Sequence, residues 1–326
     1  MKTMTWMRRG LWALGALACM AHAWAQPTDW PSRNIRLIVP YAAGGPADLV
    51  ARELALTLTN DLKQSVTVEN MGGAMGVPAL GTVARAEPDG HTLLLAAVGN
   101  VVLQPMLSKR GGADLVAKLK PVGPVSTAPH VLAVSSKLPV NNVAQLVAYA
   151  KAHPGQLSLA TNGEGGYPHL TFEDLRLKAG FTYLHVPYKG SVQVTNDVLS
   201  GQVQAGILGM APFTPHIRAG KMRLIAISSP EKVSDWPDAP LAQDTVPGFS
   251  ALGWFGYVAP AGTPPDIVEK LNKAINAAIA QPAVTEKLQN MGLMVVRESP
   301  QYFEKILRSD YERYGQIVKA IGYQPQ

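Results

Sequence analysis

The chain alternates short apolar runs with amphipathic segments, beginning at residue 35. The first run, at 35–39, is followed by apolar positions at Leu49, Val50, Leu54 and Leu58, which have helical spacing. Further strands are predicted at 66–69, 93–98, 131–134, 157–161, 183–187, 203–208, 224–228, 254–258 and 295–296. Helices are predicted to end near 62, 85, 152, 179, 199 and 219, followed by one that Thr263 caps, one from 282 and one at 300–321. Asn141 and Asn142 offer caps for the helix that ends near 152. This alternation predicts an α/β fold with parallel strands and right-handed crossovers.

The alternation breaks twice, at about 121–130 and near 251–259. A chain that leaves one lobe, builds a second and returns breaks at two such places. We therefore expect lobe 1 to comprise residues 26–128 and 254–326, and lobe 2 residues 129–253. The ends of the strands then form a ligand cleft that closes by hinge motion. The weak pattern at 103–124 predicts surface chain, and the Pro-, Asp- and Ser-rich stretch 229–250 predicts a long surface loop.

Two glycine-rich loops connect a predicted strand to a predicted helix, at Tyr41–Asp48 and Thr161–His169. Glycine lets the backbone approach a guest closely, and the first N–H groups of a helix have no partner within it. With the helix dipole, these donors favour an anion such as a carboxylate or phosphate. The alternative is a plain strand-to-helix turn.

Three side chains in or near these loops have two interpretations each. Asp48 can act as a base, or hydrogen-bond the amides of its own loop. His169 can bind a ligand, or satisfy local backbone at its helix start. Lys189 can pair with an anion, or be a solvated turn residue.

Tyr167 and Tyr188 can line a cleft or pack as ordinary amphipathic rings. His185, inside an apolar strand, is expected to be buried and hydrogen-bonded.

The first 25 residues have the features of a cleavable signal peptide: basic residues at the start, an apolar core at 11–20 and a small-x-small site at Ala23–Ala25. The core is too short to span a membrane. The chain's only cysteine, Cys19, lies in this segment, and Ala16 stands where a lipid-anchor signal needs an aliphatic residue.

Cleavage leaves 26 basic and 23 acidic side chains, a net charge of +3. That charge is too small to predict nucleic-acid binding. The sequence contains no nucleophile elbow, Walker A motif or intact dinucleotide fingerprint. We therefore expect no catalysis, no cofactor and no metal.

Several stretches together resemble the Bug-type receptors, the periplasmic binding components of tripartite tricarboxylate transporters. In chain order they are Arg36–Asp48 with Ala51–Arg52, Val68–Asn70, Pro88–Leu94, His185–Gly190 and Ala259–Pro264. The resemblance implies a two-lobed periplasmic-binding-protein type II (Venus flytrap) fold. It also implies a monomer without catalysis that delivers a small organic carboxylate to membrane permease subunits. The alternative is a receptor that feeds a sensor kinase.

In that family the two glycine loops hold the ligand carboxylate, largely through backbone amides and ordered waters. The residues implied here are Tyr41, Ala43, Gly44, Gly45, Pro46, Asp48, Gly99, Asn100, Thr161, Asn162, Gly163, Gly166, Tyr167, His169, Tyr188, Lys189, Leu208, Gly209 and Met210.

This chain departs from the family pattern at two places. Leu208 stands where members often have an Asp that could pair with a ligand amine, and Tyr167–Pro168 replaces small hydroxylated residues. Both changes favour a carboxylate whose remainder is uncharged or aromatic.

Overall fold

The computed structural model describes residues 30–108, 112–233 and 236–325. The predicted signal peptide, residues 1–25 with Cys19, lies outside these ranges. The chain divides into two units, Met1–Ser32 and Arg33–Gln326. Everything below concerns the second unit, which holds all the strands and helices named here.

A mixed sheet forms the centre of this unit, in the strand order β2-β1-β3-β9-β4-β7-β5-β6. In the first half, β1 (Ile35–Val39) pairs in parallel with β2 (Val66–Asn70) and β3 (Thr92–Ala97). In the second half, β5 (Ser158–Thr161) pairs in parallel with β6 (Leu184–Pro187) and β7 (Ala205–Gly209). The alternating pattern of the sequence therefore gives two parallel half-sheets.

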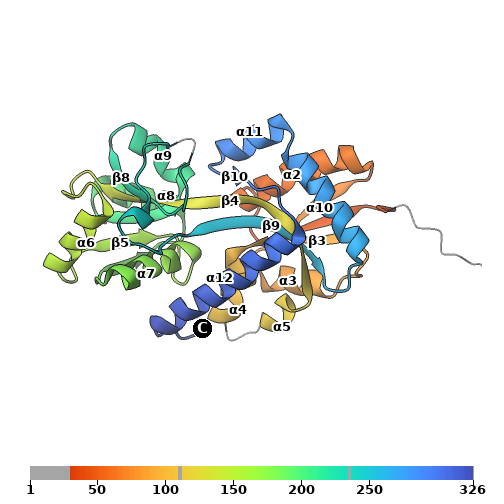
Figure 1. Ribbon diagram of the computed structural model, residues 1–326, viewed down its shortest axis with the longest axis horizontal. Coiled ribbons are helices and arrows are strands. Elements are labelled where there is room, and N and C mark those ends of the chain that lie inside the picture. Colours follow the sequence, from red (N-terminus) through yellow and green to blue (C-terminus); the bar gives the residue numbers. More distant parts are fainter. Residues whose placement is uncertain (1–29, 109–111, 234–235, 326) are drawn as a thin grey trace, which may run out of the picture. The chain divides into compact units, whose positions relative to one another are not determined.

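Two long strands, β4 (Leu119–Ser135) and β9 (Leu252–Pro260), join the half-sheets (Figure 1). β9 pairs antiparallel with β3 on one side and with residues 119–129 of β4 on the other. From His130 onward, β4 pairs antiparallel with β7 and then also with β8 (Met222–Ile227), whereas β10 (Met294–Val295) pairs with the first part of β4. β4 thus changes partners between Pro129 and His130.

Helices cover both half-sheets, and the longer ones bury an apolar stripe. One cluster joins Ile38 and Leu94 to Phe303, and others join Leu159 to Phe172 and Ala160 to Phe213. The α-helices are α2 (Pro46–Leu62), α3 (Val77–Ala84), α4 (Gln104–Leu107), α5 (Ala113–Val116), α6 (Val143–Ala152), α7 (Tyr167–Ala179), α8 (Ser191–Ser200), α9 (Met210–Arg218), α10 (Pro265–Ile279), α11 (Pro282–Asn290) and α12 (Pro300–Ala320). Short 3₁₀ turns lie at η2 (Ala74–Gly76) and η4 (Ala242–Asp244), and a π-helical turn at η3 (Val98–Leu103).

The prediction of surface chain at 103–124 is wrong. Leu103, Leu107 and Val122 are buried, and β4 already begins at Leu119. The prolines that suggested a loop, at 121 and 124, lie where the register with β9 shifts. Proline is tolerated at such irregularities because no ladder hydrogen bond is needed from its nitrogen.

Two other local predictions are also wrong. The stretch 229–250 is not simply a surface loop, since Val233, Leu241, Val246 and Phe249 are buried in it. Thr263 does not cap α10, because its hydroxyl donates instead to the Pro260 carbonyl.

No helix within the described residues is long and apolar enough to cross a membrane.

Candidate ligand-binding site

The carboxyl ends of the two half-sheets point toward each other. β3 ends at Ala97, which pairs with Phe255 of β9, and Phe255 pairs with Ser126 of β4. β7 ends at Gly209, which pairs with His130 of β4. Because β3 runs in the same direction as β4 and β7 in the opposite one, both ends are directed at the β4 segment 126–130. Four residues of strand span about 13 Å, so the loops that follow β3 and β7 face the same stretch of β4 from opposite directions.

The first loop, Tyr41–Asp48, is held by the carboxylate of Asp48. Its Oδ2 accepts hydrogen bonds from the Gly44 N–H, at 2.8 Å, and from Arg52 Nε, at 3.0 Å. Its Oδ1 accepts from Asn70 Nδ2 at 3.0 Å, and the same nitrogen donates to the Tyr41 carbonyl. Asp48 therefore ties the loop to α2 and to the end of β2, as the second of the two sequence interpretations expects.

This carboxylate is charged but already paired. The hydrogen bond from Arg52 leads the effects that lower the pKa of Asp48 to about 2. Pro46, the first residue of α2, has no N–H, and helix geometry leaves the Ala47 and Asp48 N–H groups without a carbonyl partner in the helix. The loop can therefore offer amide donors to an anion, while Arg52 offsets the negative charge of Asp48.

The ends of β1, β2 and β3 meet beside this loop. A Cβ on Gly99 would lie 3.3 Å from the Tyr41 hydroxyl, and one on Gly72 would lie 3.2 Å from the Ala42 nitrogen. A Cβ on Gly76, whose φ is +86°, would lie 2.9 Å from Pro40 Cβ and 3.3 Å from Asn100 Cβ. Burial raises the pKa of Tyr41 to about 12, so its hydroxyl stays protonated and can donate.

Asn100 is in this group, but its side chain faces the protein. It is buried, its Oδ1 accepts from the Ala97 N–H at 2.9 Å, and its Nδ2 donates to the Leu95 carbonyl at 3.4 Å. Asn100 thus completes the end of β3 where the π-helical turn begins, and its side-chain amide is not offered to a ligand.

The second loop, Thr161–His169, has the same strand-to-helix arrangement. The Gly165 N–H donates to His169 Nδ1 at 3.0 Å, and the Thr161 hydroxyl donates to the Gly163 carbonyl at 3.1 Å. Thr161 Oγ1 also lies 2.7 Å from His185 Nε2. His169 therefore satisfies local backbone, and His185 has a partner but is only half-buried, because β6 is an edge strand.

Neither histidine is a cation at neutral pH. Burial is the main cause that lowers the pKa of His169, and it lowers that of His185 to about 4. The donors available to an anion here are therefore amides, at the start of α7, rather than imidazolium groups.

The Tyr167 ring packs inside the protein. It lies 4.5 Å from the His130 ring and 5.9 Å from that of Tyr314 of α12, and a Cβ on Gly253 would approach it to 3.0 Å. Tyr167 therefore contacts β4, β9 and α12 from its place on α7. Of the two sequence interpretations, the structure agrees with an ordinary packing role.

Two candidates follow β6. The Tyr188 hydroxyl donates to Asp197 of α8 at 2.5 Å, while its N–H donates to the Thr161 carbonyl. Lys189 is exposed. Tyr188 thus supports the second loop from its backbone, with its hydroxyl already engaged.

The comparison with known families decides the class of the protein. A sequence model of the "Tripartite tricarboxylate transporter family receptor" matches residues 50–323. The chain belongs to this receptor family. Protein BugT of Bordetella pertussis is 36% identical over 300 residues, 90% of each chain.

Solved receptors share the fold. The structure of Rpa4515 from R. palustris with adipate has a TM-score of 0.77 and 30% identity, and the match covers 90% of this chain and 98% of that one. MatC from Rhodopseudomonas palustris with bound malate has a TM-score of 0.73 and 30% identity, with 89% and 100% covered. These likenesses confirm the predicted Bug-type family, the two-lobed α/β fold and the function of a periplasmic solute-binding receptor.

At the end of β7, the receptor presents backbone rather than apolar side chains. Leu208 and Met210 are buried in the cluster that contains Phe213 and Ile227, so only Gly209 lies partly exposed between them. This position has no acidic side chain, as the sequence showed, but the Leu208 side chain is buried and gives a ligand no apolar contact.

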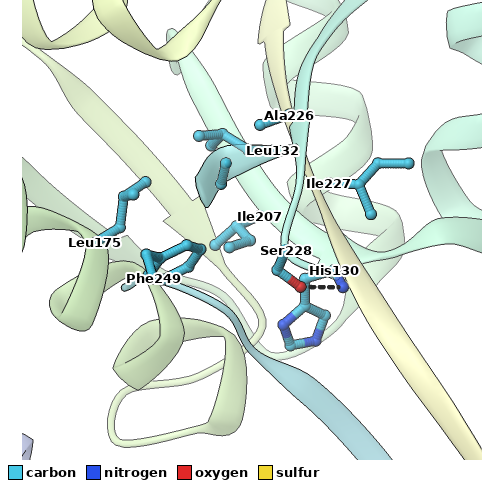
Figure 2. A pocket seen from close by; sticks show the side chains of 9 residues that line it. His130, Leu132, Leu175, Ile207, Ala226, Ile227, Ser228 and Phe249 are labelled. Carbon is cyan, nitrogen blue, oxygen red and sulfur yellow. Dashed lines mark hydrogen bonds between the residues drawn. The ribbon is translucent and has the colours of Figure 1, made fainter. Parts of the chain in front are cut away.

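Three residues that the sequence interpretation gave no role are important in the receptor. Arg52 and Asn70 complete the contacts of Asp48, and the i, i+4 spacing of Asp48 and Arg52 was a readable signal. His130 sits where β4 changes partners, at a small cavity (Figure 2) of about 10 Å³, roughly the room one water needs. Ser228 accepts the His130 N–H at 2.8 Å, and no local sequence signal marks this contact.

The described residues contain no group of three or more His, Cys, Asp or Glu side chains arranged to hold a metal ion.

Proposed function

We propose that this receptor captures a small organic carboxylate between the loops Tyr41–Asp48 and Thr161–His169 and delivers it to membrane permease subunits. The observation that supports this most directly is the pairing register, which aims the carboxyl ends of β3 and β7 at one short segment of β4. Each half-sheet brings a glycine-rich helix start to that space.

The chemistry of both loops suits an anion held by amides. The Ala47 and Asp48 N–H groups at the start of α2, and those of Tyr167 and His169 at the start of α7, have no carbonyl partner within their helices. Arg52 pairs with the one buried carboxylate of the first loop. The proposed subsites thus attract a carboxylate without presenting it with an unpaired negative charge.

The proposed ligand lacks an amine. Leu208 stands where an acidic side chain could pair with one, and the adipate and malate of the two solved relatives are carboxylates without an amino group. Because Leu208 and the Tyr167 ring pack inside the protein, the apolar remainder expected from the sequence loses its support, and we propose only a carboxylate without an amine. We expect a dissociation constant in the micromolar range, about 8 kcal/mol of binding free energy.

The proposed lobes are 26–128 with 254–326, and 129–253. The exchange of β4 partners between Pro129 and His130, and the start of β9 at Leu252, support these boundaries. Closure of the lobes around the ligand by hinge motion then excludes water from the carboxylate.

The remaining parts of the proposal concern location and assembly. Residues 1–25 are removed during export to the periplasm, and the mature receptor works as a monomer without catalysis. Native mass spectrometry of the purified protein tests both points, because it reports the mass of the mature chain, its oligomeric state and any retained ligand.

Calorimetry tests the ligand class with citrate, malate, adipate, nicotinate, benzoate and glutamate. We expect micromolar binding of at least one acid without an amine and weak binding of glutamate. Tight glutamate binding with no binding of the other acids contradicts the proposal.

A further inference from the structure

The second loop is held by a pair of stacked histidines. Their ring centroids lie 3.9 Å apart, with 4° between the ring planes. We propose that His169 and His185, each with its proton on Nε2, are positioning residues that fix the turn Gly163–Gly165 and so align the donors at the start of α7. This inference rests on the proposed function, because it assigns the turn to the carboxylate site.

His169 holds the turn by accepting a hydrogen bond. Its Nδ1 lies 3.0 Å from the Gly165 nitrogen, whose N–H points at it. An imidazole nitrogen that accepts carries no proton, so the single proton of neutral His169 is on Nε2. His169 is 7% exposed, and Gly165 has a φ of +67°, which glycine adopts without steric cost. Because glycine also adopts many other conformations, the hydrogen bond to the ring selects this one turn.

His185 holds the same turn through Thr161. The Thr161 hydroxyl has one hydrogen, which it donates to the Gly163 carbonyl at 3.1 Å. In the proposed arrangement this hydrogen stays on Gly163, and His185 Nε2 donates to Thr161 Oγ1 across the 2.7 Å contact. His185 then has the same tautomer as His169, and the two rings restrain the turn at both of its ends.

The carboxylate beside His169 is already engaged by other groups. Glu173 of α7 lies 3.9 Å from His169 Nε2, but it accepts from Arg176 at 2.6 Å and from the Tyr183 hydroxyl at 2.6 Å. Glu164 acts on His185 through space, and the Tyr323 hydroxyl lies beside Gly165. Two stacked imidazolium rings would repel each other, and no free carboxylate adjoins both, so the stack requires neutral rings.

Protonation has a defined geometric result. A proton on His169 Nδ1 would point at the Gly165 N–H, so this hydrogen bond breaks and the turn moves. The burial that lowers the pKa of both rings keeps them neutral at pH 7. The alignment should therefore be complete at neutral pH and be lost as the pH falls.

Paired substitutions at position 169 separate the loss of the hydrogen-bond acceptor from the loss of side-chain volume. In His169→Asn, the amide oxygen can stand near the position of Nδ1 and accept from Gly165, whereas His169→Leu fills space without accepting. We expect calorimetry with adipate at pH 7 to give a dissociation constant within about threefold of wild type for Asn and at least about tenfold weaker for Leu. Equal affinities for the two variants overturn the proposal. The pair His185→Gln and His185→Leu tests the second ring in the same way.

Nitrogen-15 NMR of the wild-type rings tests the geometry without a ligand. At pH 7, both histidines should show a protonated Nε2 and an unprotonated Nδ1, and the Gly165 amide should shift in His169→Leu but little in His169→Asn. A protonated Nδ1 on either ring overturns the proposal, even if adipate binds. If wild type binds no carboxylate while the NMR result holds, the proposed function fails and the positioning of the turn stands.

The pH profile provides a third test. Titration of adipate itself affects wild type and His169→Asn equally, so the ratio of their affinities isolates His169. Because the pKa of His169 lies below its ordinary 6.5 and that of His185 lies at about 4, we expect wild type to lose affinity relative to His169→Asn as the pH falls from 6.5 to 4. A ratio that stays constant down to pH 4 contradicts the requirement for a neutral ring.

Discussion

The Asp48 carboxylate shows how one residue determines the shape of a loop. It accepts three hydrogen bonds from three separate parts of the chain: the loop itself, the next turn of α2 and the end of β2. The residue type and its place at a helix start predicted the bond to its own loop. The partner from β2 could not be predicted, because it depends on how two parallel strands lie side by side.

Replacing Asp48 with Ala should weaken ligand binding by about tenfold or more. The change leaves the Gly44 N–H without its acceptor and removes one of the two acceptors of Asn70 Nδ2, which costs about 1–3 kcal/mol, and the loop loses its fixed shape. Calorimetry with the best wild-type ligand measures the effect. Glu53→Gln is the matched control, because Glu53 lies on the same helix but pairs with a surface lysine. Unchanged affinity in a folded Asp48→Ala protein refutes this role.

His130 should make the folded protein less stable in mild acid. Burial lowers its pKa from 6.5 to about 3, so between these values the unfolded chain binds a proton that the folded one does not. The free energy of unfolding is therefore highest above about pH 6.5 and decreases as the pH is lowered. Protonation of this histidine in the unfolded chain accounts for a loss of about 2 kcal/mol at pH 5. Urea denaturation at pH 7, 6 and 5 measures it. The pH slope should be shallower in His130→Gln, and an identical slope in the variant contradicts the assignment.

At the scale of elements, the sequence predicted most helices and strands well, because each has one apolar face or one apolar run. Asn142 caps α6 as its position suggested. The predictions failed where tertiary structure overrides local pattern. Pro121 and Pro124 indicate a loop to any local analysis, yet β4 accommodates them at register shifts beside β9. Likewise, Asn100 looked available to a ligand, and only the end of β3 explains why its amide turns inward.

Gly76 should be essential where η2 meets α3, beside the first loop. An added Cβ would lie 2.9 Å from Pro40, in addition to the strain of a φ of +86°. Gly180, at the end of α7, has a φ of +65° and open space around it, so Gly180→Ala serves as the control. We expect Gly76→Ala to reduce the free energy of unfolding by about 1–3 kcal/mol more than the control does. Urea denaturation of both variants measures this, and equal losses contradict it.

At the scale of the whole unit, α12 binds elements of both half-sheets. Arg313 donates to Asp174 of α7 at 2.5 Å, and Asp310 accepts from the Trp254 indole of β9 at 2.7 Å. The Tyr314 ring meets that of Tyr167 edge to face. The last helix thus braces the start of α7, where the second loop ends, against the strands that connect the half-sheets. No property of α12 alone predicts this.

Arg313→Met should destabilise the protein because it leaves the buried Asp174 carboxylate with only Lys178. Since Arg313 is about a quarter exposed, we expect a loss of about 1–3 kcal/mol, below that of a fully buried pair. Arg308→Met is the control on the same helix, because its pair with Glu304 is exposed and should contribute almost nothing. Similar unfolding midpoints for the two variants in urea contradict a bracing role for Arg313.

The position of β9 also has a consequence for biogenesis. This strand fills the place between β3 and β4, yet the ribosome makes it only after β5 to β8 are complete. A nascent chain that begins to fold early carries β3 with an open edge, and such edges recruit strands from other molecules. The order of the strands therefore favours folding after synthesis is finished, and it gives an advantage to any factor that keeps the polypeptide extended until then.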